Sequence, residues 1–442
     1  MNYQQITNQK QLFNMQKYTP IIGLEIHIEP NTKSKMFCGC QEDHFGAKPN
    51  TQTCPICLGL PGALPIANSE AIKKTMQLGL TLGSNISKIS KFYRKHYFYP
   101  DLAKSYQISQ KDNPFCIGGS LMGKKINHIH LEEDAGKLIH SKDESLIDFN
   151  RSGCALIEMV TEPVFHDISE VMSFVKELQL VVRYLDISNA DMEKGTMRLE
   201  ANISLSTSEK LPNYKVELKN INSFKFLEKA IKTEIERQTN ALNSGQKLAQ
   251  ETRGYDEKTK TTFSQRTKAD SDDYRYFPEP DIAPIEIPGS MILDLRSRIP
   301  ELPEQKRKRF AEKYKLSSDY INILVSDLER ANYFEKACSL SKEYKTIANL
   351  IINKNFDKEY PEPAGLVKKI YDLGSKMYES AKVTKNAVEK VLIDNPDIVT
   401  SYKNGKGQVI GFLIGQVQKK LKGKGNPKLV NDKIVELIRK NF

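Results

Sequence analysis

The sequence contains no tryptophan and no long hydrophobic run. The aromatic side chains available to stack on a ligand are therefore its 19 tyrosines and 18 phenylalanines. No apolar stretch approaches the roughly 20 residues of a membrane-spanning helix, and the first 18 residues are polar, with neither an apolar core nor an arginine. These absences argue against a secretory leader and a membrane partner. They predict a cytoplasmic protein, with an organellar location as the alternative.

Charge is plentiful, with 66 basic against 55 acidic residues and a net charge of +11. A positive balance suits a polyanionic partner such as nucleic acid, although a general preference for lysine would produce it as well. Near the C-terminus, five lysines gather beside glycines and either form a solvated face or follow a phosphate backbone. These lysines are Lys419, Lys420, Lys422, Lys424 and Lys428.

At 442 residues the chain exceeds what one hydrophobic core supports, so two or three domains are expected. Residues 19–295 hold the alternating strand patterns, and from residue 302 onward the pattern is almost wholly helical. We predict an α+β fold whose mostly antiparallel sheet and covering helices occupy residues 19–295. A helical domain in 296–364 and a small helical tail domain in 365–442 follow, and an N-terminal extension occupies 1–18.

Polar and apolar residues alternate between residues 21 and 28, the pattern of a strand with one buried face. Because side chains alternate along a strand, Glu25 and His27 share the polar face. Similar faces recur in three later segments: His128, His130 and Glu132; Glu200, Asn202 and Ser204; and Lys215, Glu217 and Lys219. Polar sheet faces normally meet water, but these residue types bind metal and phosphate, so the pattern predicts a shared polar basin.

Four of the seven cysteines lie in two close pairs: Cys38, Cys40, Cys54 and Cys57. Their C-x-C-x13-C-x2-C spacing predicts a structural Zn²⁺ site with four thiolates. A pair of disulfides is the alternative, but it fits an exported protein. The isolated Cys116, Cys154 and Cys338 are expected to be packing residues.

Two helices are expected within the sheet-forming region. Asp167, with Glu170 three residues later, is a helix-start signal ahead of an apolar stripe, and a second helix is expected over 224–242. Residues 118–124 read GxxxxGK, as in a phosphate-binding loop, but Lys125 replaces the Ser or Thr and a strand pattern follows. We expect a hairpin turn there, because the helix N-terminus that would meet a phosphate is missing.

Long strings of the sequence resemble the B subunits of the bacterial-type, heterotrimeric, glutamine-dependent aspartyl/glutamyl-tRNA(Asn/Gln) amidotransferases. The resemblance covers nearly everything after residue 18, and the strings follow the family's order. They are GLEIH (23–27), TCPICLGLPGALP (53–65), RKHYFYPDLAKSYQISQ (94–110), HLEEDAGK (130–137), DFNRSG (148–153), VTEP (160–163), ELKNINSF (217–224), QETR (250–253), DYRYFPEPD (273–281), GFLIGQV (411–417) and GNPKLVN (425–431). Glu200 departs from the family, since many members carry Asp there, so its part in a site stays open.

The resemblance implies a ligase that acts on Glu-tRNA(Gln), Asp-tRNA(Asn) or both. Such a B subunit uses ATP and Mg²⁺ to phosphorylate the side-chain carboxylate of the misacylated amino acid, and ammonia derived from glutamine then displaces the phosphate. The implied partners are an amidase A subunit, a small C subunit and the misacylated tRNA, which the tail domain touches. The catalytic body is implied to be a cradle.

Transferring a phosphate from ATP to a carboxylate requires a metal and other cations that neutralise the negative phosphate and carboxylate oxygens. Mg²⁺ prefers one or two protein carboxylates together with water and phosphate, so Glu25 with Glu132 or Glu133 fits this need. The resemblance adds His27 to the metal site. Alternation puts Glu132 on the face of His130 and Glu133 on the opposite face, but a bulge would reverse this assignment, so both remain candidates.

Six basic side chains are candidates for holding phosphate: Arg94, Lys95, Lys137, Arg151, Arg198 and Arg275. A surface ion pair is the alternative for each, and the resemblance favours Lys95 and Arg151 as catalytic residues because they lie inside long matching strings. Asn150 and Asn202 are candidates for holding a carbonyl or the terminal ribose of the tRNA. A zinc-bearing tRNA adaptor without catalysis is the competing function; it accounts for the basic tail and the cysteines but not for the acidic basin.

Overall fold

The computed structural model describes residues 18–208, 210–267 and 274–441. The extension predicted for residues 1–18 lies outside this range apart from Tyr18. The chain forms two compact units, divided between Pro303 and Glu304. Helix α5 (Gly289–Ser297), which the predicted boundary at 295 cuts, belongs to the first unit, because its Leu295 is buried in that unit's core.

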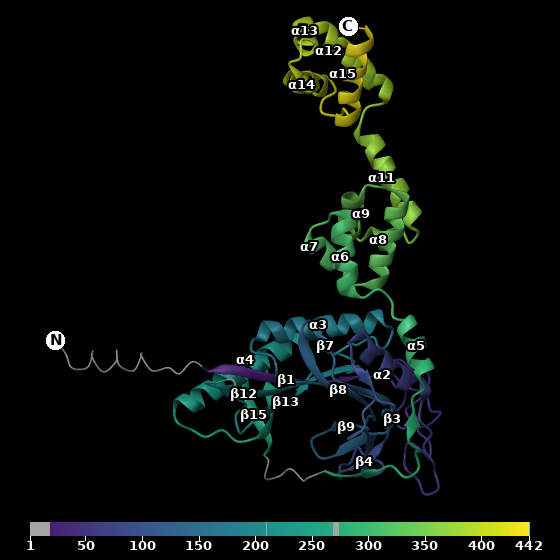
Figure 1. The fold of residues 1–442 in the computed structure, drawn as a ribbon, viewed down its shortest axis with the longest axis vertical. Helices are drawn as coiled ribbons and strands as arrows, with labels where there is room; N and C mark the ends of the chain where they lie inside the picture. The colour runs from purple at the N-terminus through teal and green to yellow at the C-terminus, as the bar shows by residue number, and fades with distance from the viewer. Residues whose placement is uncertain (1–17, 209, 268–273, 442) are drawn as a thin grey trace, which may run out of the picture. The chain divides into compact units, whose positions relative to one another are not determined.

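Ten strands of the first unit form one large sheet in the order β15-β14-β13-β12-β1-β11-β8-β6-β2, with β7 beside β8 (Figure 1). Their bounds are β1 Thr19–Ile28, β2 Asn85–Ile86, β6 Cys116–Ile117, β7 Ser120–Leu121, β8 Lys124–Glu133, β11 Ala155–Thr161, β12 Met197–Ser206, β13 Val216–Ile221, β14 Glu251–Asp256 and β15 Thr261–Thr267. Among these described strands, neighbours are antiparallel except for the parallel pair β13 and β14. The predicted α+β class with a mostly antiparallel sheet is confirmed.

Strand β1 lies at the centre of the sheet, between β12 and β11. Its apolar residues Leu24, Ile26 and Ile28 are buried and belong to the main hydrophobic core. Helices α3 (Ile168–Tyr184) and α4 (Phe224–Asn243) contribute their apolar stripes to the same core and lie along one side of the sheet (Figure 1). Because the strands alternate, the polar residues of β1 point to the opposite side.

Both covering helices begin where the sequence predicts. The Asp167 carboxylate accepts a hydrogen bond from the Ser169 N–H at 2.6 Å, and Glu170 accepts one from the His166 N–H at 3.1 Å. Ser223 caps α4 by accepting from the Phe226 N–H at 3.1 Å. These side chains satisfy N–H groups that a helix start leaves unpaired. Helix α2 (Ser69–Thr81) contributes Ala71, Ile72, Met76 and Leu78 to the same core.

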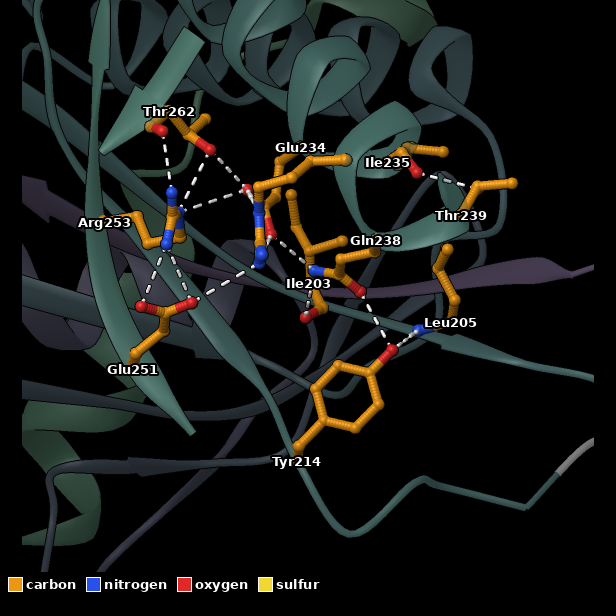
Figure 2. A network of polar contacts seen from close by, with 11 residues as sticks. Ile203, Leu205, Tyr214, Glu234, Ile235, Gln238, Thr239, Glu251, Arg253 and Thr262 are labelled. Carbon is orange, nitrogen blue, oxygen red and sulfur yellow. Dashed lines mark hydrogen bonds and ion pairs between the residues drawn. The ribbon is translucent and has the colours of Figure 1, made fainter. Parts of the chain in front are cut away.

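A buried polar network fixes α4 against the edge strands of the large sheet (Figure 2). The fully buried Glu234 accepts hydrogen bonds from Gln238 Nε2 at 2.8 Å and from Thr262 Oγ1 at 2.7 Å. The Arg253 guanidinium lies 3.6 Å from Glu234 and also donates to Thr262. The Tyr214 hydroxyl donates to Gln238 Oε1 at 3.0 Å. Because its buried groups are paired with one another, this network holds β14, β15 and the segment before β13 in place.

Among the described residues, the first unit also contains three small sheets: β16-β4-β5, β10-β9 and β17-β3. Their strands are β3 Ile89–Ser90, β4 Tyr93–His96, β5 Tyr106–Ser109, β9 Lys137–His140, β10 Ser145–Asp148, β16 Arg275–Pro278 and β17 Ile285–Glu286. The hairpin that joins β7 to β8 turns at Met122 and Gly123, whose φ angles are 51° and 75°. This confirms the predicted turn at 118–124 in place of a phosphate-binding loop.

The second unit is helical, as predicted for residues after 302. Its elements are α6 Pro303–Tyr314, α7 Ser318–Val325, α8 Leu328–Leu340, α9 Tyr344–Lys354, α10 Phe356–Glu359, α11 Pro363–Met377, α12 Ala381–Asp394, α13 Pro396–Lys403, η2 Gly407–Val409, α14 Ile410–Lys420 and α15 Pro427–Asn441. Helices α12 to α15 form a core of their own, which includes Val388, Leu413 and Ile434. Within the described part of the chain, no helix is long and apolar enough to cross a membrane.

Candidate active site

Polar side chains of five neighbouring strands, β13, β12, β1, β11 and β8, meet on the face of the large sheet that α3 and α4 leave uncovered. The register places Glu158 of β11 opposite His27 of β1 and opposite His130 of β8. On the other side of β1, Glu200 of β12 lies opposite Glu25. Directly opposed residues of a sheet point to the same face, so segments far apart in the sequence converge in one basin.

A cluster of two imidazoles and two carboxylates lies across β1, β11 and β8; we call it the His27 cluster. His27 Nε2 lies 3.3 Å from a Glu158 oxygen and 3.8 Å from a Glu132 oxygen. His130 Nε2 lies 3.4 Å from Glu158 and 3.7 Å from Glu132. Ligand atoms of His27, Glu132 and Glu158 lie within 4.8 Å of one another, so these three side chains are able to share one metal ion.

The charges of the His27 cluster stabilise one another. Burial alone lowers the pKa of His27, but the carboxylates of Glu158 and Glu132 outweigh burial and raise it to about 9. Conversely, burial raises the pKa of Glu158, but His130, His27 and Lys95 together hold it well below its ordinary value. Without a metal, His27 is therefore protonated at neutral pH, and a bound cation would take the place of that proton.

The strand register decides which of two adjacent carboxylates faces the cluster. Strands β8 and β11 stay in continuous register from Glu133 to His128, so no bulge reverses the alternation. Glu132 accordingly lies on the face of His130. Glu133 points the other way, where it forms an ion pair with Lys104 and accepts a hydrogen bond from the Ile108 N–H at 2.9 Å.

A second acidic group lies next to the first, on β1, β12 and β13; we call it the Glu25 cluster. Carboxylate oxygens of Glu25, Glu200 and Glu217 lie within 4.8 Å of one another. Lys219 Nζ lies 3.0 Å from Glu200 and 3.5 Å from Glu217, and Asn202 Nδ2 donates to Glu25 at 2.8 Å. Burial raises the pKa of Glu25, and so do the negative charges of Glu158, Glu200 and Glu217.

A cleft of about 380 Å³ opens beside the Glu25 cluster. Its polar walls include Glu25, Asn202, Tyr214, Lys215 and Gln250. Tyr214 is held by the buried network of α4, because its hydroxyl bonds to Gln238 (Figure 2). The segment 211–215, which Tyr214 anchors to α4, therefore forms one wall of this cleft.

Lys95 reaches the basin from the separate sheet β16-β4-β5. Its ammonium lies 4.8 Å from the centre of the Tyr274 ring. Burial lowers the pKa of Lys95, but the negative charges of Glu132 and Glu158 outweigh burial and raise it. A cation held near the two carboxylates is suited to binding a phosphate that lies over the cluster.

Comparison of the sequence with known proteins identifies the family of the chain that carries this site. Residues 20–293 match the GatB/GatE catalytic domain, and residues 358–438 match the GatB domain. The chain belongs to the GatB family. It is 40% identical to the B subunit of the aspartyl/glutamyl-tRNA(Asn/Gln) amidotransferase of Persephonella marina, over 96% of this chain and 100% of that protein. It is 42% identical to the like-named protein of Clostridium novyi, over 95% of this chain and 99% of that protein. Both relatives align along their full length, so the resemblance stated from the motifs is confirmed.

Within this GatB chain, three of the arginines proposed for phosphate are bound by protein acids. Arg94 forms two hydrogen bonds of 2.8 Å with Glu279, whose carboxylate is fully buried. Arg198 lies 2.6 Å from Asp134, and Arg151 lies 3.5 Å from it. Burial raises the pKa of Asp134, but these two arginines outweigh burial and lower it to about 2. The structure thus gives the three arginines structural partners.

The remaining basic candidates lie on the small sheets, and Asn150 lies in a turn. Lys137 and Arg275 are exposed on β9 and β16 of the small sheets. Asn150 is buried and holds the cysteine-bearing loop, since it accepts from the Gln52 N–H at 2.8 Å and donates to the Lys48 carbonyl at 2.7 Å. Of the two asparagines, only Asn202 lines the cleft.

Sequence reasoning missed Glu158 and gave no definite role to Glu217 and Glu200, two other acidic residues of the basin. Glu158 is the single charge within the apolar string ALIEMV (155–160), and this isolated charge was the available signal. Glu217 was noted only as part of an alternating strand. Glu200 was left open because it departs from the family pattern, yet it lies between Glu25 and Lys219.

The four clustered cysteines come together as the spacing predicts. Sulfur atoms of Cys38, Cys40, Cys54 and Cys57 all lie within 4.8 Å of one another, so they are able to hold a metal ion. The fully buried Lys35 approaches Cys57 at 3.9 Å and donates to the Ser152 carbonyl at 2.8 Å. The isolated Cys116, Cys154 and Cys338 are all buried.

Proposed function

We propose that the chain is the B subunit of a glutamine-dependent amidotransferase, a carbon–nitrogen ligase that forms Gln-tRNA(Gln), Asn-tRNA(Asn) or both. Relatives aligned over their whole length are named as B subunits of aspartyl/glutamyl-tRNA(Asn/Gln) amidotransferases. The observation that carries the proposal is the convergence of His27, Glu132 and Glu158 in one cluster. Lys95 lies close enough for the charges of both carboxylates to raise its pKa.

The proposed reaction has two steps. A carboxylate oxygen of the misacylated Glu or Asp attacks the γ-phosphorus of ATP, the bond to ADP breaks, and an acyl phosphate forms. Ammonia then attacks the acyl carbon, phosphate leaves with the electron pair of the C–O bond, and nitrogen loses a proton to give the amide. Negative charge gathers on oxygen in both steps, so the site must supply cations.

The His27 cluster suits Mg²⁺ through its donor set. Glu132 and Glu158 offer the one or two carboxylates that Mg²⁺ accepts from proteins, and His27 adds a nitrogen. When bound, Mg²⁺ neutralises the oxygens of the transferred phosphate. His130 is proposed to orient both carboxylates through Nε2; its Nδ1 is buried and has no partner among the described residues.

The Glu25 cluster and its cleft are proposed to receive the aminoacyl end of the tRNA. Asn202 donates to Glu25, while its buried Oδ1 has no hydrogen-bond partner within the described chain. This oxygen is therefore available to accept from an N–H or O–H group of the substrate. Glu25, Glu200 and Glu217 also form an acidic group able to hold a second divalent cation.

Lys95, on the small sheet β16-β4-β5, is proposed to bind the phosphates of ATP. The lysines near 419–428 are proposed to contact the tRNA backbone, and Zn²⁺ is proposed at the four clustered cysteines. The relatives are named as B subunits, which supports an assembly with other subunits. We propose that these are the amidase A subunit and the small C subunit.

The test is transamidation by the assembled complex. The chain is combined with its A and C subunits and given each misacylated tRNA, with glutamine, asparagine or ammonium as donor. We expect amide formation only when ATP is present, with one ADP released per amide. Glu25→Gln should lower this activity while glutamine hydrolysis persists, and Glu162→Gln is the matched control. Binding of tRNA without any ATP-dependent turnover would instead support the non-catalytic adaptor.

A further inference from the structure

A third group of metal-binding side chains lies beyond the His27 cluster, at the end of β1. Glu29 follows His27 by two residues, so it continues the polar side of the strand. Its Oε1 lies 3.1 Å from His44 Nε2, and the Cys154 sulfur completes a set whose ligand atoms all lie within 4.8 Å of one another. In a strand, two residues advance the chain by about 6.6 Å, so this set is separate from the His27 cluster.

These side chains are largely removed from water. Glu29 is 6% exposed and Cys154 is fully buried. Two cations of this region form their close contacts elsewhere: Lys35 donates to the Gln52 and Ser152 carbonyls, and Arg198 pairs with Asp134. A buried carboxylate without a close cation costs free energy, and a bound metal ion removes that cost.

Glu42, whose backbone carbonyl lies next to Cys154, gives an independent sign of a ligand. It is 4% exposed, its Oε1 accepts from the Ala155 N–H at 2.9 Å, and its carbonyl lies 3.7 Å from the Cys154 sulfur. Its other oxygen, Oε2, is buried and has no hydrogen-bond partner among the described residues. Buried polar atoms are nearly always paired, so an unpaired carboxylate oxygen beside three metal-binding side chains calls for a cation.

We propose that Glu29, His44 and Cys154 form a second Zn²⁺ site, distinct from the four clustered cysteines, with the unpaired oxygen of Glu42 beside it. One thiolate, one imidazole and one carboxylate are donors that Zn²⁺ accepts, while a sulfur ligand disfavours Mg²⁺. On binding, the Cys154 thiol releases its proton to solvent and its sulfur binds the ion. The site links the loop that carries Glu42 and His44 to β1 and β11, so its expected effect is on stability.

The test compares two buried cysteines in the full-length chain. Cys154→Ser removes the sulfur ligand, whereas Cys116→Ser is the matched control, since Cys116 donates to the Thr75 carbonyl at 3.6 Å and belongs to none of the metal-binding groups found among the described residues. Each chain is stripped, reloaded with Zn²⁺ in excess Mg²⁺, and measured for bound zinc. We expect about one equivalent less zinc in Cys154→Ser than in Cys116→Ser, whatever the occupancy of the four clustered cysteines. Equal zinc contents would overturn the proposal.

A second measurement covers the case in which Cys154→Ser does not fold. His44→Gln alters a side chain that is 14% exposed, and it should lower the zinc content by the same equivalent. Reloading with Co²⁺ should give a sulfur-to-cobalt absorption band in the Cys54→Ser chain that weakens when Cys154→Ser is added. A band of equal strength in both chains counts against the site. Neither readout uses transamidation, so the result is independent of the proposed function.

Discussion

The Glu158 carboxylate lies 3.3 Å from the His27 imidazole, across a directly opposed pair of β11 and β1. This contact joins the two strands at the centre of the basin. It also holds a positive imidazolium against a negative carboxylate in a place where either charge alone would be costly.

Stability should depend on pH through His27. Its pKa is raised from 6.5 to about 9 in the folded chain, because the carboxylates of Glu158 and Glu132 outweigh burial. A raised pKa stabilises the fold fully below the unfolded value, and this contribution is lost as pH rises through about 9. In metal-free chains, the free energy of unfolding should fall by on the order of 1–3 kcal/mol between pH 6.5 and 9. Urea unfolding of His27→Gln should lack most of this fall; an equal fall in both chains would contradict the ion pair.

We expect Asp134 to stabilise the fold through its ion pairs with Arg198 and Arg151 and to take no part in catalysis. Asp134→Asn leaves Arg198 and Arg151 without their shared counter-charge, and breaking a buried pair costs about 3–5 kcal/mol. We expect a clearly lower urea midpoint. Glu257→Gln is the control, because its ion pair with Lys229 is exposed, and its midpoint should not change. An unchanged midpoint for Asp134→Asn would show that the arginines do not need this carboxylate.

Lys95 and Arg94 are neighbours in sequence, but substituting them should have different effects on activity and stability. Lys95→Met removes the cation beside Glu132 and Glu158, so ATP-dependent turnover per folded molecule should fall by about 10²-fold; the thermal midpoint should drop as well, because Lys95 offsets the charges of these two carboxylates. Arg94→Met leaves the buried Glu279 unpaired, so the midpoint should drop while turnover per folded molecule is kept. Measuring both quantities for both variants checks the assignment, and the opposite pattern would reverse it.

The four clustered cysteines should bind metal as a unit. Cys54→Ser is expected to lower the zinc content and the thermal midpoint together, because a structural site contributes its binding free energy to folding. Cys338→Ser, which alters a buried cysteine of the second unit, should leave the zinc content unchanged. Full zinc retention in Cys54→Ser would make the four cysteines ordinary core residues.

Local patterns predicted what depends on local spacing. Alternation identified β1 and put Glu132 on the face of His130, and Asp167 with Glu170 marked the start of α3. The family strings brought in His27 and Lys95. These features depend on residues within a few positions of one another, or on strings shared with relatives.

The partners of the charged residues could not be predicted in the same way. Arg94 is bound by Glu279, which lies 185 positions away, and Arg198 by Asp134, which lies 64 away. Which charge meets which depends on the pairing order of the strands. Glu158 was missed for the same reason, since a lone acid in an apolar strand becomes meaningful only when His27 and His130 are seen on either side of it.

The most direct test of the whole account is transfer of the γ-phosphate of ATP by the assembled complex that carries Glu158→Gln. We predict that ADP formation dependent on misacylated tRNA falls by about 10²–10³-fold, while glutamine hydrolysis persists. The matched Glu162→Gln, in which the altered carboxylate bonds to Asn127 outside both clusters, should keep normal transfer. Wild-type transfer by Glu158→Gln would contradict the account, because the cluster at the centre of the basin would then take no part in the chemistry.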